Sequence, residues 1–138
     1  MDAKVTWKNG LAFDGTSDSG FTIPLDSFSP ASGEGTGFRP LELIAVGLGG
    51  CTAMDVISIL QKMKQEVSAF EVKVHADRAE EHPKVFTNIE LEYIVTGKNI
   101  DRASVEKAVN LSETRYCSAQ AMLRTAVPIQ SRITINEG

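Results

Sequence analysis

The chain has 138 residues, of which 42% are hydrophobic, and this is enough for one domain with a core. Its 14 basic and 18 acidic side chains are scattered and leave a formal net charge of −4, which argues against a nucleic-acid surface with clustered Lys and Arg. Residues 1–10 lack the apolar core of a signal peptide, and Glu42 and Asp55 interrupt the best candidate for a membrane span. We therefore expect a single cytoplasmic domain over residues 1–138, with no membrane or nucleic-acid partner.

Residues 4–25 show the pattern of short antiparallel strands. Val5 and Trp7 alternate with polar neighbours, and glycines at positions 10, 15 and 20 mark turns. Residues 27–38 are rich in Ser, Gly and Pro, which predicts a loop.

A long helix is predicted from Pro40 to about Gln65. Proline suits the first helical position because its missing N–H costs nothing there. Before Cys51 the apolar residues cover nearly every face, which is typical of a buried helix. At 1.5 Å per residue its length is about 40 Å. Because one small domain can hardly cover that length, we expect a second copy of the chain to cover part of it.

The second half of the chain predicts a hairpin, two helices and a last strand. Residues 70–80 and 85–97 alternate around a turn at His82 and Pro83, with Glu90 and Glu92 on the solvated face. Asn99 or Asp101 is expected to cap a helix that runs to about Ser112, and a second helix opens around Cys117 and ends by Pro128. Residues 129–135 form the closing strand. This order predicts an α+β fold with helices packed on antiparallel sheet.

The two cysteines, Cys51 and Cys117, have two interpretations. A free cysteine in a core helix is usually a small hydrophobe. In a cytosolic protein, two cysteines are more often reduced thiols or a redox pair than a structural disulfide. Small residues flank both of them, and Cys117 lies at a predicted helix start, with Arg115 nearby, where N–H groups and the helix dipole favour a thiolate. The spacing of Cys and His does not match a metal site, so we expect no metal.

The surroundings of Cys51 raise two questions. Gly49 and Gly50 each cost a helix about 0.8–1 kcal/mol relative to alanine, and we expect them to allow a partner's helix to approach. Asp55 is four residues after Cys51 on the same face, so a thiolate there needs a cation. Arg39 is the candidate, although it can instead pair locally with Glu42.

Arg39 reaches Cys51 only under special conditions. The two residues are separated by about 18 Å along an unbroken helix, which exceeds the reach of the side chain. The arginine must therefore come from a second subunit, or the helix must break at the glycine pair. We favour the second subunit.

The segments RPLELIAVGLGGCTAMDVISIL and YCSAQAMLRTAVPIQSRITI resemble the OsmC/Ohr family of osmotically inducible and organic hydroperoxide resistance proteins. The resemblance covers nearly the whole chain, and the form GGCTAMDV is similar to the OsmC-like branch. It implies an intertwined homodimer in which antiparallel sheets wrap central apolar helices, with active sites at the dimer interface.

The resemblance also implies a thiol peroxidase that reduces organic hydroperoxides without a bound cofactor. Cys51 would be the peroxidatic thiol and Cys117 the resolving one, which form a disulfide that a dithiol of the lipoyl or thioredoxin kind reduces. Because no arginine precedes Arg39, this residue and Glu42 are the candidates for the arginine and glutamate of the family site.

Two alternatives stay open from the residues alone. The first is a binding module in which an apolar groove at the dimer interface holds a small hydrophobic ligand and the cysteines only pack. The second is a thioesterase. It ranks lower because no Asp or Glu has neighbours in the sequence that would mark it as a hydrolytic base.

Overall fold

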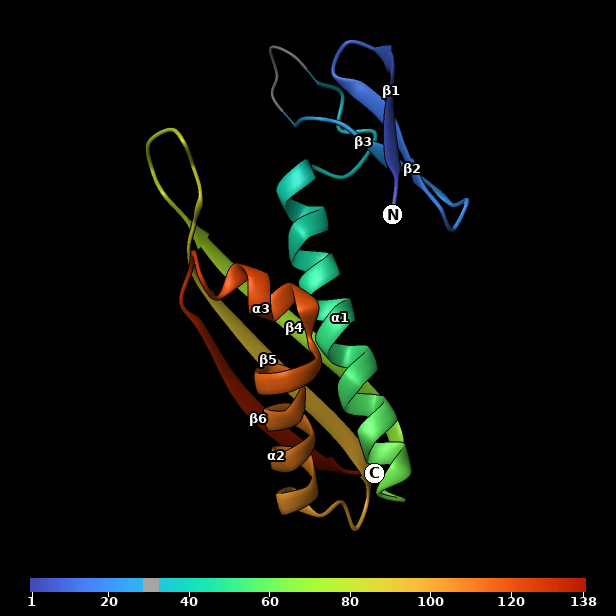
Figure 1. Cartoon of the computed structure of the whole chain (residues 1–138), viewed down its shortest axis with the longest axis vertical. Coiled ribbons are helices and arrows are strands. Elements are labelled where there is room, and N and C mark those ends of the chain that lie inside the picture. Colours follow the sequence, from blue (N-terminus) through green and yellow to red (C-terminus); the bar gives the residue numbers. More distant parts are fainter. Residues whose placement is uncertain (29–32) are drawn as a thin grey trace. The chain divides into compact units, whose positions relative to one another are not determined.

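The computed structural model describes residues 1–28 and 33–138 and contains two compact units, Met1–Ile44 and Ala45–Gly138 (Figure 1). The helix α1 (Pro40–Lys62) begins in the first unit and continues into the second. Pro40 is its first residue, as predicted. The expectation that residues 1–138 form one domain stays a prediction.

The N-terminal unit contains a three-stranded antiparallel sheet in the order β1–β2–β3. Its strands are β1 (Ala3–Asn9), β2 (Ala12–Ser17) and β3 (Thr22–Leu25), which confirms the short strands expected there. Gly10 has a φ of 51° in the turn between β1 and β2, a conformation that favours glycine. The loop predicted at 27–38 has no helix or strand in its described part, and residues 29–32 lie outside the described residues.

The C-terminal unit contains the sheet β4–β5–β6, with β4 (Glu66–Arg78) antiparallel to β5 (Phe86–Lys98). The helix α2 (Arg102–Leu111), the π-helical turn η1 (Ser112–Tyr116) and the helix α3 (Ser118–Leu123) connect β5 to β6 (Ile129–Glu137). Asp101 caps α2 by accepting the backbone N–H of Ser104 at 3.0 Å, as one of the two predicted caps.

One strand pairing differs from the prediction. The strand β6 runs parallel to β5, whereas we expected antiparallel pairing throughout. The reason is that the connection through α2, η1 and α3 crosses over one face of the sheet and returns the chain in its original direction. The alternation of side chains within a strand does not indicate whether the strand pairs in parallel or antiparallel.

The core of the C-terminal unit lies between its sheet and its helices, which occupy one face of the sheet (Figure 1). The alternation of β5 is confirmed over most of its length, although Val85 lies outside the strand and is exposed. The buried hydrophobic residues of this core are Leu48, Val56 and Leu60 of α1, Ile89, Leu91, Tyr93 and Val95 of β5, Val105, Ala108 and Val109 of α2, and Val127.

The expectation that charges interrupt every candidate membrane span is wrong for α1. Between Glu42 and Lys62 only Asp55 is charged, so α1 is long and apolar enough to cross a membrane by length and composition. The core helix of a soluble protein passes the same test. Only 28% of its most apolar window is buried, so residues 1–28 and 33–138 leave much of this apolar helix uncovered.

Candidate functional site

Cys51 lies in the middle of α1 and is half-buried. The helix continues without a break through Gly49 and Gly50, so the alternative that it breaks there is wrong. A Cβ atom at Gly49 would lie 2.9 Å from Cγ2 of Val74 in β4, whereas no described atom lies within 4 Å of one at Gly50. Gly49 therefore allows close packing of α1 on β4 within the chain. The approach of a partner's helix, which we expected the glycines to allow, stays a prediction.

Cys117 is the buried N-cap residue of α3. Its Sγ accepts the backbone N–H of Gln120 at 3.4 Å, and its own N–H donates to the carbonyl oxygen of Ser112 at 2.9 Å. The second bond spans five residues, which is the pattern of the π-helical turn η1. Such turns are rare and occur frequently at functional sites.

The structure brings Cys51 and Cys117 together as two free thiols. The pKa of Cys117 is raised from 9.0 to about 11; burial is the largest cause, and the side chain of Cys51 adds to the rise by hydrogen bonding and by its charge. This corrects the expectation that the helix start favours a Cys117 thiolate, because desolvation outweighs the N–H of Gln120. Arg115 lies over the ring of Tyr116, 5.6 Å from its centroid, which places its charge on an aromatic partner.

A network of buried polar side chains connects α1 to β5, η1 and α3. Oγ1 of Thr52 lies 2.8 Å from the hydroxyl of Tyr93 and 2.7 Å from Oγ of Ser112. Nε2 of Gln120 donates to Thr52 Oγ1 at 3.1 Å and to the Tyr93 hydroxyl at 3.2 Å. All four side chains have no solvent exposure, and burial raises the pKa of Tyr93 to about 12.

Each end of this network carries a charge. Oγ of Ser112 donates to Oδ2 of Asp55 at 3.0 Å, and the guanidinium of Arg124 donates to Oε1 of Gln120 at 2.7 Å. We expected the charge of Asp55 to oppose a thiolate at Cys51. In the structure this carboxylate accepts a hydrogen bond from the hydroxyl of Ser112. Sequence reasoning missed the network because its members come from four elements and Tyr93 fits the apolar alternation of its strand.

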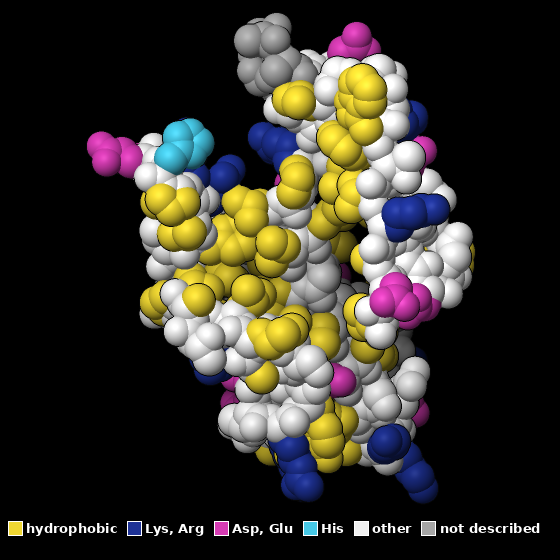
Figure 2. Space-filling view, turned by 45° about the horizontal axis from the view of Figure 1, so that its top comes forward, with side chains coloured by type: hydrophobic (Ala, Val, Ile, Leu, Met, Phe, Trp, Pro, Cys, Tyr) yellow, Lys and Arg dark blue, Asp and Glu magenta, His cyan; other side chains and the backbone are white. Residues whose placement is uncertain are grey.

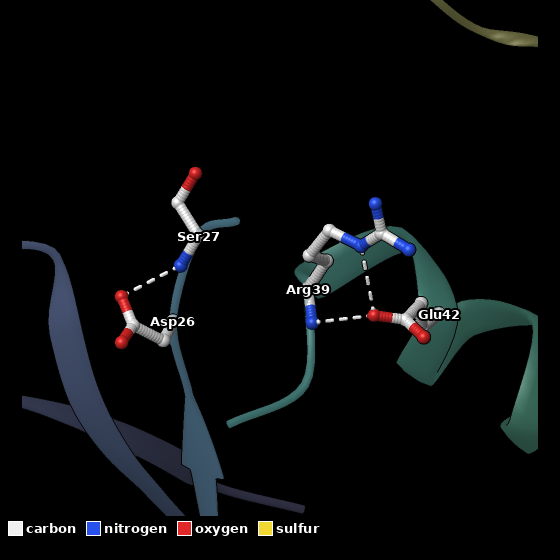
Figure 3. A network of polar contacts seen from close by, with 4 residues as sticks. All are labelled: Asp26, Ser27, Arg39 and Glu42. Carbon is white, nitrogen blue, oxygen red and sulfur yellow. Dashed lines mark hydrogen bonds and ion pairs between the residues drawn. The ribbon is translucent and has the colours of Figure 1, made fainter. Parts of the chain in front are cut away.

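Arg39 and Glu42 form a pair in the N-terminal unit (Figure 3). The backbone N–H and Nε of Arg39 both donate to Oε1 of Glu42 at 3.0 Å. The two bonds lower the pKa of Glu42, and the backbone bond has the larger effect. The local pair considered above therefore exists in the chain. In this structure the glutamate, and not a cysteine, is the partner of Arg39.

Asp26 organises the loop that leads to this pair (Figure 3). Its carboxylate accepts the N–H of Ser27 at 2.7 Å and both the hydroxyl and N–H of Thr36 at 2.7 and 3.1 Å. The hydroxyl of Thr36 is the largest cause that lowers the pKa of Asp26 to about 2. Sequence analysis did not select Asp26, because one Asp before a Ser-rich loop is an ordinary turn residue.

An apolar groove of about 470 Å³ lies between α1 and β4. Val46, Gly49 and Ala53 line it from α1, and Phe70, Val72 and Val74 line it from β4. Since successive helical residues turn by about 100°, Cys51 lies about 160° from both Gly49 and Ala53. The groove is thus on the other side of α1 from Cys51. In residues 1–28 and 33–138, no group of three His, Cys, Asp or Glu side chains could hold a metal ion.

Comparison with known proteins identifies relatives along nearly the whole chain. A family model described as OsmC-like protein matches residues 33–132. Protein YhfA of Escherichia coli K12 is 45% identical over 129 residues, which cover 94% of this chain and 93% of YhfA. The crystal structure of a hypothetical protein from Aquifex aeolicus VF5 has 29% identity and a TM-score of 0.81, and the match covers 98% and 96% of the two chains. The organic hydroperoxide resistance protein OhrB of Bacillus subtilis shares the fold, with 24% identity, a TM-score of 0.64 and coverage of 97% and 98%.

Proposed function

The chain belongs to the OsmC-like family, whose fold it shares with organic hydroperoxide resistance proteins, and we propose that it is a cysteine-dependent peroxidase that reduces organic hydroperoxides. The observation that carries this proposal is the pair of neighbouring free thiols, Cys51 on α1 and Cys117 at the start of α3. The two differ in burial, and the raised pKa of Cys117 keeps its proton in place when Cys51 carries charge.

The proposed reaction uses the two sulfurs in turn. The Cys51 thiolate attacks the peroxide oxygen distal to carbon, so that an S–O bond forms, the O–O bond breaks and the alkoxide leaves as an alcohol after taking a proton. The sulfur of Cys117 then attacks the Cys51 sulfenic acid, and the hydroxyl leaves as water with the proton of the Cys117 thiol. A dithiol of the lipoyl or thioredoxin kind reduces the resulting disulfide by exchange, and no bound cofactor takes part.

The proposal includes a cytoplasmic homodimer. The uncovered apolar surface of α1 supports the second subunit. A partner's Arg39–Glu42 pair would then be the source of the cation that a Cys51 thiolate requires.

The first test measures consumption of tert-butyl and fatty-acyl hydroperoxides with a dithiol reductant. We expect Cys51→Ser to lower the rate by at least about a hundredfold, because it removes the nucleophile. Ser58→Ala, two turns further along α1, is the matched control and should keep the wild-type rate. Equally slow consumption by wild type and Cys51→Ser would end the catalytic proposal.

The second test follows the resolving step by mass spectrometry under non-reducing conditions. After treatment with one equivalent of peroxide, the wild type should lose two hydrogens and yield a peptide that links Cys51 to Cys117. Detection of over-oxidised Cys51 without this peptide would remove Cys117 from the reaction.

The groove between α1 and β4 favours a second candidate, a binding module for a small hydrophobic ligand. Its volume of about 470 Å³ lies in the usual range of ligand sites. A lipid retained in native mass spectrometry, together with thiols that do not react with a neutral alkylating agent, would support this function over the peroxidase.

A further inference from the structure

Only one arrangement of hydrogen-bond donors and acceptors satisfies the buried network. Arg124 lies at one end of the network. The guanidinium has only donors, so it fixes Oε1 of Gln120 as the acceptor at 2.7 Å. The orientation of the amide is thereby set, and Nε2 of Gln120 donates to both Thr52 and Tyr93. The cation at the end of the network therefore determines the orientation of the Gln120 amide.

The other end of the network fixes the hydroxyl groups. Ser112 has one hydroxyl hydrogen, which it donates to Asp55, so Thr52 must donate to Ser112. The single hydrogen of Thr52 is then committed, and Tyr93 must donate to Thr52. Oγ1 of Thr52 thus donates once and accepts twice, which uses all of its capacity. The hydrogen bonds run in one direction from Arg124 to Asp55.

Three members of this network are attached to the cysteines. Thr52 follows Cys51 in α1. The carbonyl oxygen of Ser112 accepts the N–H of Cys117 at 2.9 Å, and the N–H of Gln120 donates to the sulfur of Cys117 at 3.4 Å. Side-chain bonds of Ser112 and Gln120 to Thr52 therefore tie both flanks of Cys117 to the residue beside Cys51.

We propose that Thr52, Tyr93, Ser112 and Gln120 are positioning residues that hold the sulfur of Cys117 at that of Cys51 and thereby set the equilibrium between the dithiol and the Cys51–Cys117 disulfide. This inference rests on the proposed function only in taking the two cysteines as a redox pair. The positioning acts through backbone and hydroxyl groups, and none of the four side chains reacts.

Thr52 is the residue at which the inference is tested most sharply. Valine at this position removes the hydroxyl, so that Gln120, Tyr93 and Ser112 each lose one hydrogen-bond partner. Serine keeps the hydroxyl. Val105→Ala is the matched control for lost stability, because Val105 is buried in α2 and has no polar side-chain atom. Tyr93→Phe removes a hydroxyl that donates once and accepts once in the same network. This variant replaces Thr52→Val in the test if Thr52→Val does not fold.

The experiment equilibrates each reduced protein with mixtures of glutathione and glutathione disulfide and counts free thiols by alkylation and mass spectrometry. In this exchange the two cysteines are oxidised to a disulfide, and one glutathione disulfide is reduced to two glutathione thiols. We expect Thr52→Val and Tyr93→Phe to shift the equilibrium constant about tenfold toward the dithiol, which is about 30 mV for a two-electron couple. Thr52→Ser and Val105→Ala should retain the wild-type value.

A shift below twofold in both Thr52→Val and Tyr93→Phe would overturn the inference, as would an equal shift in Val105→Ala. Failure of the wild type to form the disulfide would overturn it as well. Because no peroxide is present, the result is separate from the proposed function. A wild type that forms the disulfide in glutathione but does not consume hydroperoxides would refute the peroxidase and leave the positioning role in place.

Discussion

Cys117 is subject to opposing electrostatic effects. Burial and the side chain of Cys51 raise its pKa, and the backbone N–H groups of Gln120 and Ala119 lower it. Burial is the largest of these, so the pKa is about 11. A resolving thiol does not need to be a thiolate before the sulfenic acid forms, because the departing hydroxyl accepts its proton. The protonated state of Cys117 is therefore compatible with the proposed chemistry.

The first prediction at this scale concerns the influence of Cys51 on Cys117. In Cys51→Ala the hydrogen bond and the charge of Cys51 are lost, so the pKa of Cys117 should fall from about 11 toward 9.0. Burial remains and should keep it above that ordinary value. Thiolate absorbance in the ultraviolet, followed against pH, measures the change. A pKa of Cys117 that is identical in wild type and Cys51→Ala would contradict this account of its environment.

The same pKa predicts how stability depends on pH. The folded chain holds the proton of Cys117 more tightly than the unfolded chain, so the group contributes stability that is fully present below pH 9.0. That contribution should be lost as the pH rises from 9.0 through about 11. Denaturant unfolding of wild type and Cys117→Ala over this range should show a steeper decline for the wild type. Parallel declines would contradict the prediction.

At the scale of the element, α1 makes different contacts on three of its sides. Leu48, Thr52 and Val56 face the core, whereas Gly49 faces β4, where a Cβ atom would lie 2.9 Å from Cγ2 of Val74. Cys51 lies on another side of the helix, toward Cys117. A helix that presents a reactive group, a close packing contact and a polar network has no single polar face, which explains the weak amphipathic pattern of its sequence.

The two glycines of α1 should respond differently to alanine. Gly49→Ala places a Cβ 2.9 Å from Val74, and the resulting overpacking costs about 1–3 kcal/mol. This cost should outweigh the gain of about 0.8–1 kcal/mol in helix propensity and lower the free energy of unfolding. Gly50→Ala meets no described atom within 4 Å and should not lower it, since alanine favours a helix by about 0.8–1 kcal/mol. Urea denaturation measures both. Equal losses would contradict the contact with β4, and a loss in Gly50→Ala that depends on protein concentration would indicate a partner's helix at Gly50.

At the scale of the whole molecule, a large part of the apolar surface is exposed. Met54 and Val46 of α1 are 74% and 60% exposed, and Trp7 in β1 is 64% exposed. Figure 2 shows many hydrophobic side chains exposed at the surface. Exposed apolar surfaces of this kind are typical of contact sites. They support the proposal of a homodimer.

The dimer is tested with two lysine substitutions on α1. Met54→Lys introduces a charge at an exposed apolar position and should shift the protein from dimer to monomer in sedimentation velocity, because an unpaired charge is costly in an apolar interface. Gln61→Lys introduces the same side chain at an exposed polar position of the same helix and should leave the dimer intact. A wild type that sediments as a monomer would refute the proposed homodimer.

The sequence by itself determined the elements and the family. Alternation located the strands, Pro40 marked the start of α1, and Asn99 or Asp101 marked that of α2. The segments around Cys51 and Cys117 indicated the OsmC-like family. These signals are local, because the periodicity of apolar residues and the helix caps depend on residues that are close together in the sequence. Only the tertiary structure decided the parallel pairing of β6, the contact of Gly49 with Val74 and the raised pKa of Cys117. It also decided that Thr52 meets Tyr93, Ser112 and Gln120. These contacts join residues far apart in the chain, and such residues meet only where the topology brings their elements together and removes the water between them.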